Sequence, residues 1–340
     1  MSRILVVNAG STSLKLSVVE NGASSRVDEI EKAGEVEAVA HRVVHGGSRF
    51  TEPVLIDAGV RRALEEVAEL APLHNRPALE AIDDALRVIP DAPHVAVFDT
   101  AFHRTIPAEA ATYAVPARWR DEWGIRRFGF HGLSVQWASE QVTVPRLVVC
   151  HLGGGCSVTA VRDGKSVDTT MGYSPLEGVP MATRSGSLDA EIVLHLLRSR
   201  SLELDAIERA LETESGLLGL SGESARVEEL ERSGSPAAEL ALAVFANRVA
   251  AAVAAMAAAL DGIDALVFTA GVGERSARVR RDVCARLGFL GVGLDAGANE
   301  KASPDADIGT SGSRVRVVVL AAREDLVAAR AAAALLSLDG

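Results

Sequence analysis

Cysteines are few and basic residues are outnumbered in this chain, and both features exclude classes of protein. The 340 residues include three cysteines, Cys150, Cys156 and Cys284, an odd and unclustered set. Such a set predicts reduced thiols, with neither a disulfide framework nor a zinc site, and favours a cytoplasmic location. The 46 acidic residues outnumber the 35 basic ones and give a net charge of −11. Because nucleic acid and anionic membranes require a basic face, we expect neither as a partner.

Long apolar runs are also scarce. The longest is Ala237–Leu260, which alanine dominates and which Glu239, Asn247 and Arg248 interrupt, so we expect a buried helix rather than a membrane span. The first residues lead directly into a strand pattern, and we expect no signal peptide. With 48% apolar and 24% charged residues, a chain of this length is typical of a globular protein with two domains.

The first predicted hairpin, Ile4–Gly22, has the composition of a phosphate-binding turn. An apolar strand pattern breaks at Ala9–Ser13, resumes as the alternating run Leu14–Val19 and stops at Asn21-Gly22. This pattern predicts a β-hairpin with a turn of glycine and hydroxyl residues. Small residues let backbone N–H groups approach an anion, and Lys15 adds a positive charge just after the turn. An ordinary hairpin would explain this segment equally well.

A second segment, Leu147–Gly164, repeats the plan of the first. It has an apolar strand pattern, a Gly-rich turn, an alternating strand pattern and then Asp163-Gly164. Two such hairpins at corresponding places predict a duplicated α/β fold that holds phosphates from both sides of a cleft.

The rest of the chain continues the α/β pattern. Further strands are predicted at Val39–His45, His94–Phe98, Ser166–Thr170, Ala265–Thr269 and Val315–Leu320. Helices are predicted at Gly59–Leu70, Arg76–Val88 and Glu324–Leu336, with a break at Pro72–Asn75, and also within Leu188–Leu260. Three non-strand features complete the prediction: a surface connection at Ala23–Glu37, a long functional loop at Met171–Ser187, and Ser187 as the cap of the next helix.

Polar residues at strand ends and in loops are the candidates for chemistry. These are Asn8, Lys15, Arg42, Asp99, His131, Arg184 and Glu324. Two well-separated arginines suit a doubly charged transferring group, because phosphoryl transfer is catalysed mainly by positioning and electrostatics. The apolar neighbours of Arg42 argue against a surface ion pair, whereas an ordinary loop arginine explains Arg184 equally well. Packing is the simpler explanation of His41, His45 and an isolated His131.

A glycine loop follows the strand predicted at Ala265–Thr269. The strand–GxG–helix order of Ala270–Glu274 indicates a nucleotide site, but a dinucleotide fingerprint would need a third glycine where the chain has Ser276.

The order of several long motifs resembles the acetate kinase (acetate/propionate kinase) family. The strings are VVNAGSTSLK, HRVVHGG, LAPLHN, VFDTAFHRTIP, FGFHG, DTTMGYSPLEG, TRSG, SGLLGLSG and FTAGVGE. The resemblance runs from Asn8 to the final helix and belongs to the acetate branch rather than to butyrate kinases. It implies two duplicated domains of the actin/sugar-kinase (ribonuclease H-like) fold with a cleft between them. It also implies an ATP:carboxylate phosphotransferase that uses Mg²⁺ and forms a homodimer.

The implied domains are residues 1–145 on the carboxylate side and 146–322 on the nucleotide side, with the helix of residues 323–340 packing back on the first. The resemblance assigns magnesium binding to Asn8 and Glu324, and catalysis to Arg42, Asp99, His131 and Arg184. It assigns the substrate pocket to Arg42, Val44, Leu73, His74, Phe130 and Pro175. The implied nucleotide and phosphate contacts are Ser11, Ser13, Lys15, His151, Gly153, Gly154, Gly155, Gly271, Val272, Gly273, Glu274 and Arg275.

The implied division of roles agrees with the chemistry of the acceptor. A small carboxylate is already ionised at pH 7, with a pKa near ~4–5, so no base is needed to make it a nucleophile. We therefore expect Asp99 to organise magnesium and its water. The arginines and His131 would stabilise a metaphosphate-like transition state.

The departures from the family pattern lie on the nucleotide side. Gly154 replaces an asparagine, Arg275 replaces another, and the usual Asp-x-Arg reads Arg226-Val227-Glu228; the segment before Val39 is also shorter than usual. Three hypotheses follow: ATP with altered contacts, another nucleotide or pyrophosphate as donor, or a catalytically silent ligand-binding relative. The first is favoured, because a silent binding protein does not need the magnesium pair. Acetate and propionate are not separated, since one methylene is worth only ~1–3 kcal/mol.

Overall fold

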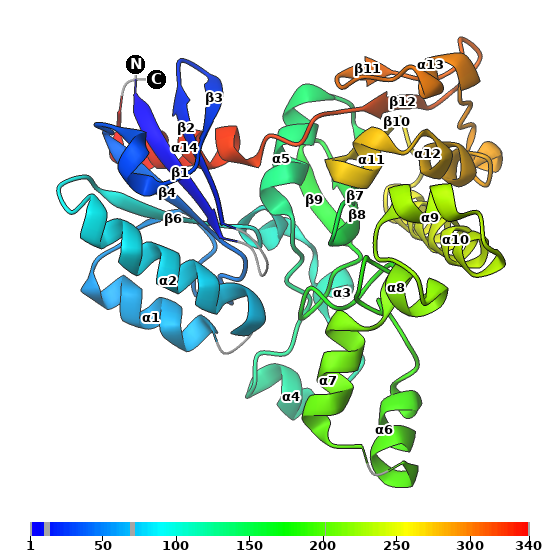
Figure 1. Cartoon of the computed structure of the whole chain (residues 1–340), viewed down its shortest axis with the longest axis horizontal. Coiled ribbons are helices and arrows are strands. Elements are labelled where there is room, and N and C mark those ends of the chain that lie inside the picture. Colours follow the sequence, from blue (N-terminus) through cyan, green and yellow to red (C-terminus); the bar gives the residue numbers. More distant parts are fainter. Residues whose placement is uncertain (1, 10–13, 69–71, 201, 339–340) are drawn as a thin grey trace.

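Two six-stranded sheets with the same layout form the framework (Figure 1). The structure is a computed structural model and describes residues 2–9, 14–68, 72–200 and 202–338, without the side chains of residues 72–74. The first sheet has the order β3-β2-β1-β4-β6-β5 and the second the order β9-β8-β7-β10-β12-β11. In each sheet the first three strands pair antiparallel, the next two join in parallel, and the last is antiparallel. The predicted duplicated α/β fold is confirmed.

The element bounds are as follows. The strands are β1 Arg3–Ala9, β2 Leu14–Glu20, β3 Ala23–Val27, β4 Ala38–Val43, β5 Val54–Leu55, β6 His94–Phe98, β7 Arg146–Leu152, β8 Cys156–Arg162, β9 Lys165–Thr169, β10 Ala265–Thr269, β11 Ala306–Asp307 and β12 Arg316–Val319. The α-helices are α1 Ala58–Ala68, α2 Pro72–Val88, α3 Ala108–Ala111, α4 Ala117–Asp121, α5 Gly132–Gln141, α6 Ala190–Ser199, α7 Leu204–Thr213, α8 Gly216–Ser221, α9 Val227–Ser233, α10 Pro236–Ala259, α11 Ala270–Arg275, α12 Ala277–Cys284, α13 Ala296–Glu300 and α14 Glu324–Leu336. The 3₁₀ turns are η1 Ile30–Ala33, η2 Ala101–Thr105 and η3 Gly288–Leu290.

Both predicted hairpins form. β1 and β2 pair from Arg3 opposite Glu20 to Ala9 opposite Leu14, and β7 and β8 pair from Arg146 opposite Arg162 to Leu152 opposite Cys156. The turn of the second hairpin is Gly153–Gly155, whereas the turn of the first falls outside the described residues.

The surface connection predicted at Ala23–Glu37 is wrong, because this segment contains β3 and η1. β3 pairs with β2 across the two-residue turn Asn21-Gly22, where φ is 54° and 74°. Both residues have positive φ, as a type I′ turn requires, and Asn-Gly is the residue pair that adopts this turn most readily. The second sheet repeats the device at Asp163-Gly164, with φ of 48° and 76°.

Two further local predictions are wrong. The expected break at Pro72–Asn75 is the first turn of α2, which begins at Pro72, and proline is tolerated there because the first helical N–H has no partner within the helix. Ser187 does not cap α6; Asp189 does, with its carboxylate accepting from the backbone N–H of Glu191 at 2.9 Å. The Ser187 hydroxyl instead accepts from the Gly178 N–H at 3.1 Å.

Helices cover both faces of each sheet. One face of the first sheet packs against α14 and Leu133 of α5, and the other against α2. One face of the second sheet packs against α10 and α12, and the other against Val135 and Ala138 of α5. Helix α5 therefore lies between the two sheets, and α14 returns the chain to the first one (Figure 1). The boundaries predicted at residues 145 and 322 remain a prediction.

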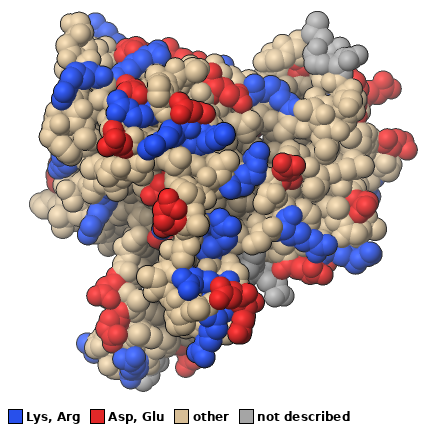
Figure 2. Space-filling view, turned by 180° about the vertical axis from the view of Figure 1, so that it is seen from behind, with Lys and Arg blue, Asp and Glu red and all other residues tan. Residues whose placement is uncertain are grey.

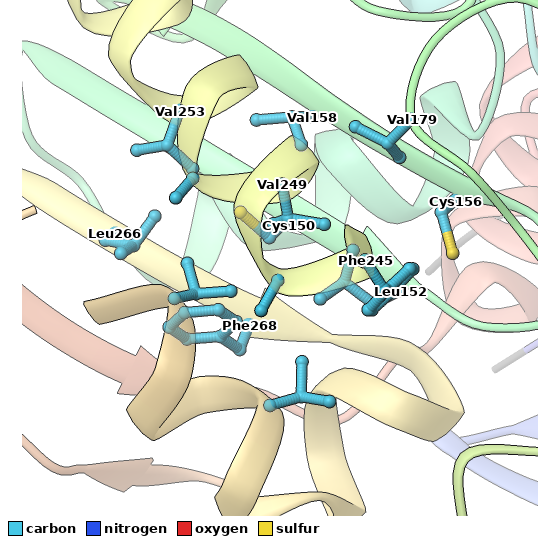
Figure 3. Packing of buried hydrophobic residues seen from close by; sticks show 14 of the residues in the cluster. Cys150, Leu152, Cys156, Val158, Val179, Phe245, Val249, Val253, Leu266 and Phe268 are labelled. Carbon is cyan, nitrogen blue, oxygen red and sulfur yellow. The ribbon is translucent and has the colours of Figure 1, made fainter. Parts of the chain in front are cut away.

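The core of the second half forms where α10 crosses β7, β8 and β10. Phe245, Val249 and Val253 pack against Cys150 and Phe268 (Figure 3). Among the described residues α10 is the one helix long and apolar enough to cross a membrane, and half of its apolar segment is buried inside the protein. This burial is typical of a core helix. All three cysteines are buried and free.

Acidic and basic side chains are interspersed on the face shown in Figure 2.

Candidate active site

A polar cleft of 740 Å³ opens between the two halves of the chain. The hairpin strand β2 and the start of α14 line one wall, and the Gly153 turn and α11 line the other. The predicted site residues on its walls are Asn8, Lys15, Arg42, His131, His151, Gly153, Gly154, Gly271, Glu274, Arg275 and Glu324. Residues from distant parts of the sequence therefore meet in one cleft.

Arg42 is the centre of a hydrogen-bonded network in this cleft. It lies on β4 between β1 and β6, so the ends of both neighbouring strands deliver side chains to it. Its Nε donates to both carboxylate oxygens of Asp99, at 3.0 and 3.1 Å, and Nη2 donates to the same carboxylate. Its Nη1 donates to Asn8 Oδ1 at 2.9 Å and lies 3.6 Å from Glu324 Oε2.

The charges of this network support one another. Burial alone would lower the pKa of Arg42, but Asp99 and Glu324 raise it, so the guanidinium stays charged. Burial raises the pKa of Asp99, which is 1% exposed, and the Arg42 guanidinium opposes that rise. Burial also acts to raise the pKa of Glu324, yet Arg42, His151 and Lys15 lower it below its usual value. Asp99 itself does not line the cleft. Its carboxylate holds the Arg42 guanidinium in place by hydrogen bonds.

The oxygens of Asn8 and Glu324 suit a magnesium ion. The amide oxygen and the ionised carboxylate both lie on the cleft wall beside Arg42 Nη1. Mg²⁺ is commonly held by one or two protein oxygens, substrate phosphates and water. Among the residues that the structure describes, no group of three or more His, Cys, Asp or Glu side chains is arranged to hold a metal. The residues therefore fit an ion that the donor's phosphates help to bind.

His131 stands at the start of α5 with left-handed backbone angles, φ 59° and ψ 25°. Its Nδ1 lies 3.0 Å from Ser157 Oγ, and its ring stacks on His151 with centroids 4.0 Å apart. Burial lowers the pKa of His131 well below its usual value, and His151, Arg42 and Arg184 lower it further. Burial likewise lowers the pKa of His151 to about 4. Both imidazoles are therefore neutral at pH 7.

Arg184 lies in the predicted functional loop. It does not line the cleft, but it lies next to the turn of the second hairpin. Its Nη1 donates to the Pro175 carbonyl at 3.3 Å, and its Nε lies 3.2 Å from Glu212 Oε2. A Cβ added to Gly155 would lie 3.4 Å from Arg184 Nη1 and 3.3 Å from His131 Nε2. The side chains of Arg184 and His131 thus both border the Gly155 turn. Burial lowers the pKa of Arg184, and Glu212 opposes this effect.

The apolar residues assigned to the substrate pocket are partly brought together. Val44 and Phe130 belong to one buried cluster, and Pro175 is buried. Leu73 and His74 lie in the first turn of α2, where side chains are outside the described part. His45 packs edge-on against Phe130, as expected for a packing histidine.

A second, smaller pocket of 210 Å³ continues the cleft between the Gly153 turn and α9. Predicted residues Gly153, Gly154, Gly271, Val272 and Arg275 line it, together with Arg226 and Glu228. Arg275 Nε pairs with Glu228 Oε1 at 3.3 Å, so the two substituted positions contact each other at the pocket. Gly155 and Gly273 do not line either cavity, and Ser11 and Ser13 lie outside the described residues.

Two groups of residues at the site were not predicted from the sequence. Ser24 and Arg26 line the cleft from β3, next to Ser17 of β2 and Asp325 of α14; the Asn-Gly turn was the available signal for β3. Arg127 was also missed. It donates from Nη1 to the carbonyls of Thr169, Thr170 and Met171 at 3.0–3.2 Å and from Nη2 to Glu177 at 3.0 Å. Arg127 thereby secures the loop that carries Arg184, and no local sequence pattern indicates these contacts.

The sequence matches known proteins over most of its length. The model of the Acetokinase family matches residues 21–330. An acetate kinase of a Synechococcus species is 46% identical over 313 residues, covering 89% of this chain and 77% of that protein. An acetate kinase of Pseudothermotoga lettingae is 41% identical over 328 residues, covering 93% of this chain and 81% of that protein.

The fold is also similar to solved structures of acetate and propionate kinases. A propionate kinase from Francisella tularensis superposes with a TM-score of 0.90 at 33% identity, covering 97% of this chain and 99% of that one. An acetate kinase from Porphyromonas gingivalis superposes with a TM-score of 0.89 at 31% identity, covering 99% of this chain and 100% of that one.

Proposed function

The chain belongs to the acetokinase family and is an enzyme that transfers a phosphoryl group from ATP to a carboxylate, and on this premise we propose that acetate is its acceptor. The products are acetyl phosphate and ADP, formed reversibly by direct in-line transfer in the 740 Å³ cleft. The curated relatives named acetate kinase support acetate, and the solved propionate kinase supports propionate as the alternative. The observation that carries the proposal is the convergence of Arg42, His131 and Glu324 on one cleft.

In this proposal the protein supplies positive charge and hydrogen bonds. Asp99 fixes the Arg42 guanidinium, whose remaining donors face the cleft and bind the acceptor carboxylate and the transferring phosphoryl group. Arg184 and His131 border the same turn and stabilise the charge on the phosphoryl oxygens. In the tautomer that we propose for His131, Nδ1 accepts from the Ser157 hydroxyl 3.0 Å away, and Nε2 carries the proton that is donated to the substrate. The Asp99 carboxylate is engaged by Arg42, and the magnesium-organising role expected for Asp99 stays a prediction.

We propose that Mg²⁺ is held by Asn8 and Glu324 together with the phosphates of the donor. When bound, the ion neutralises charge on the transferring group. Arg42 Nη1 shares the Asn8 and Glu324 oxygens, which couples acceptor binding and metal binding through one side chain.

The donor is proposed to be ATP with weakened recognition of the base. The pair Arg275–Glu228 stands where the family has other side chains, and each lost hydrogen bond is worth roughly 0.5–1.5 kcal/mol. A few such losses raise the ATP KM by about tens of fold without changing the phosphoryl chemistry.

We therefore expect acyl phosphate from ATP, with GTP and ITP used at kcat/KM values within about tenfold of ATP, since one remaining base-specific hydrogen bond is worth about tenfold at most. A hydroxamate assay with Mg²⁺, acetate or propionate, and ATP, GTP, ITP or pyrophosphate measures this. A low-micromolar ATP KM with strong rejection of GTP contradicts weakened base recognition. Activity with pyrophosphate alone would identify pyrophosphate as the donor in place of ATP. The absence of product with every donor and acid would support a silent binding protein.

Val44→Ala is expected to shift acid preference toward propionate. Val44 packs in the cluster that contains Phe130, so removing its two methyl groups enlarges the predicted alkyl pocket. One methylene of fit is worth ~1–3 kcal/mol, which allows a change of about tenfold in the ratio of the propionate and acetate kcat/KM values. Val43→Ala is the matched control, because Val43 packs in a different cluster with Phe98. An unchanged ratio in the Val44 variant would mean that Val44 does not face the acid.

We also propose a cytoplasmic homodimer. Helix α6 has no buried residue and projects from the second half with α7 (Figure 1), and one of its faces exposes Leu194 and Leu197. A second copy of the chain is the proposed partner of this face, because closed homo-oligomers commonly bury such a patch. Sedimentation equilibrium tests this against the 35.6 kDa mass of one chain.

A further inference from the structure

Arg184 has an acidic partner outside the substrate cleft. Its Nε lies 3.2 Å from Glu212 Oε2, and the two side chains are only 16% and 14% exposed. Glu212 belongs to α7, which comes after α6 in the sequence and carries none of the predicted site residues. A pair this well shielded from water keeps its geometry better than a surface ion pair does.

The backbone around the pair is tied together at three points. Thr183 Oγ1 donates to the Glu212 carbonyl at 2.8 Å, and the Ser185 N–H donates to the Leu211 carbonyl at 3.0 Å. The Ser215 N–H donates to the Thr183 carbonyl at 2.9 Å. The residues on both sides of Arg184 are thus fastened to the end of α7, so the Glu212 carboxylate and the Arg184 loop keep a fixed relation.

Two nitrogens of the Arg184 guanidinium face different neighbours. Glu212 takes Nε, whereas Nη1 lies toward the Pro175 carbonyl and 3.4 Å from a Cβ built on Gly155, the turn that His131 also borders. Because the guanidinium is planar, fixing the Nε edge also fixes the direction of the two terminal nitrogens. The Glu212 contact thereby directs Nη1 toward the Gly155 turn, which His131 also borders.

We propose that Glu212 is a positioning residue that holds Arg184 in the orientation that receives the transferring phosphoryl group. This inference rests on the proposed catalytic role of Arg184. Its carboxylate is needed as a hydrogen-bond acceptor on the Nε edge. The phosphoryl group does not contact Glu212, so a neutral side chain of the same shape should serve almost as well.

The test compares Glu212→Ala, Glu212→Gln and the matched control Glu214→Ala. Glu214 ends the same helix, but its side chain is 61% exposed and pairs only loosely with Arg209 at 3.6 Å. We expect Glu212→Ala to lower kcat about 10- to 100-fold, as misplacement of a charged donor does, with the KM of ATP little changed. Glu212→Gln, whose amide oxygen also accepts from Nε, should keep kcat within about threefold of the unsubstituted enzyme. Glu214→Ala should match the unsubstituted enzyme.

A double-mutant cycle separates positioning from general stability. If Glu212 acts through Arg184, adding Glu212→Ala to Arg184→Ala should not lower kcat further. A further tenfold loss in the double variant, with thermal melting showing folded protein, would overturn the inference, as would full activity of Glu212→Ala. Normal turnover of Arg184→Ala alone would instead overturn the role proposed for Arg184, so the two failures are distinguishable.

Discussion

Arg42→Ala is expected to lower kcat on the order of 10²-fold or more, because a donor that stabilises developing charge in a closed site is worth a few kcal/mol. Arg42 is also the group that joins Asp99, Asn8 and Glu324. Its loss removes a cation from the transferring group and releases three side chains of the site together. Steady-state kinetics of acetyl phosphate formation measures the effect.

The same substitution should lower stability, which needs a control. Asp99 is 1% exposed and would lose its counter-ion, a change that typically costs about 3–5 kcal/mol. The double variant Arg42→Ala with Asp99→Asn removes the stranded charge, so it should recover melting temperature without recovering kcat. If turnover returned together with stability, or if Arg42→Ala alone turned over normally, Arg42 would not act on the substrate.

Arg184→Ala is expected to lower kcat by a similar amount, on the order of 10²-fold, for the same electrostatic reason. Unlike Arg42, Arg184 reaches the site from a loop and lies next to the Gly155 turn rather than on the sheet. Arg184→Lys keeps the charge but not the planar fork, so it should restore only part of the activity. The measurement is kcat together with the KM values of ATP and acetate.

A control is available on another loop. Among the residues that the structure describes, Arg104 donates only to the nearby Ala101 carbonyl, and it is exposed, so Arg104→Ala should leave kcat unchanged. If Arg184→Ala loses no more activity than this control, the wrong loop arginine has been identified.

The sequence allowed the sheets and the cleft to be predicted where the information is local. Apolar strands, the two turns and the long motifs are contiguous, so β1, β2, β7 and β8 could be placed from their own residues. β3 is also predictable in principle, because Asn21-Gly22 between strand-forming residues is a hairpin signal as well as a strand end.

Other parts depend on contacts between distant segments. The carboxylate of Asp99 turns toward Arg42, 57 residues away in sequence, and spacing alone does not show whether it faces metal or guanidinium. Glu212 and Arg127 contact the Arg184 loop through side chains on unrelated elements, which no periodicity reveals. The roles assigned to individual site residues remain predictions that the variants above test.

The placement of α5 and α14 has a mechanical consequence. The chain leaves the first sheet after β6, reaches β9 of the second sheet through η2, and returns just before α14. The start of α5 stays beside the first crossing, because the Gly132 N–H donates to the Asp99 carbonyl at 3.0 Å, and α5 packs against α14. Any rotation of one half against the other must pivot near these two crossings, and points near a pivot travel least. His131 is the residue before α5 and Glu324 is the first residue of α14. Opening the cleft for substrate exchange would therefore move the outer walls, including Arg275, through a larger arc than these two side chains.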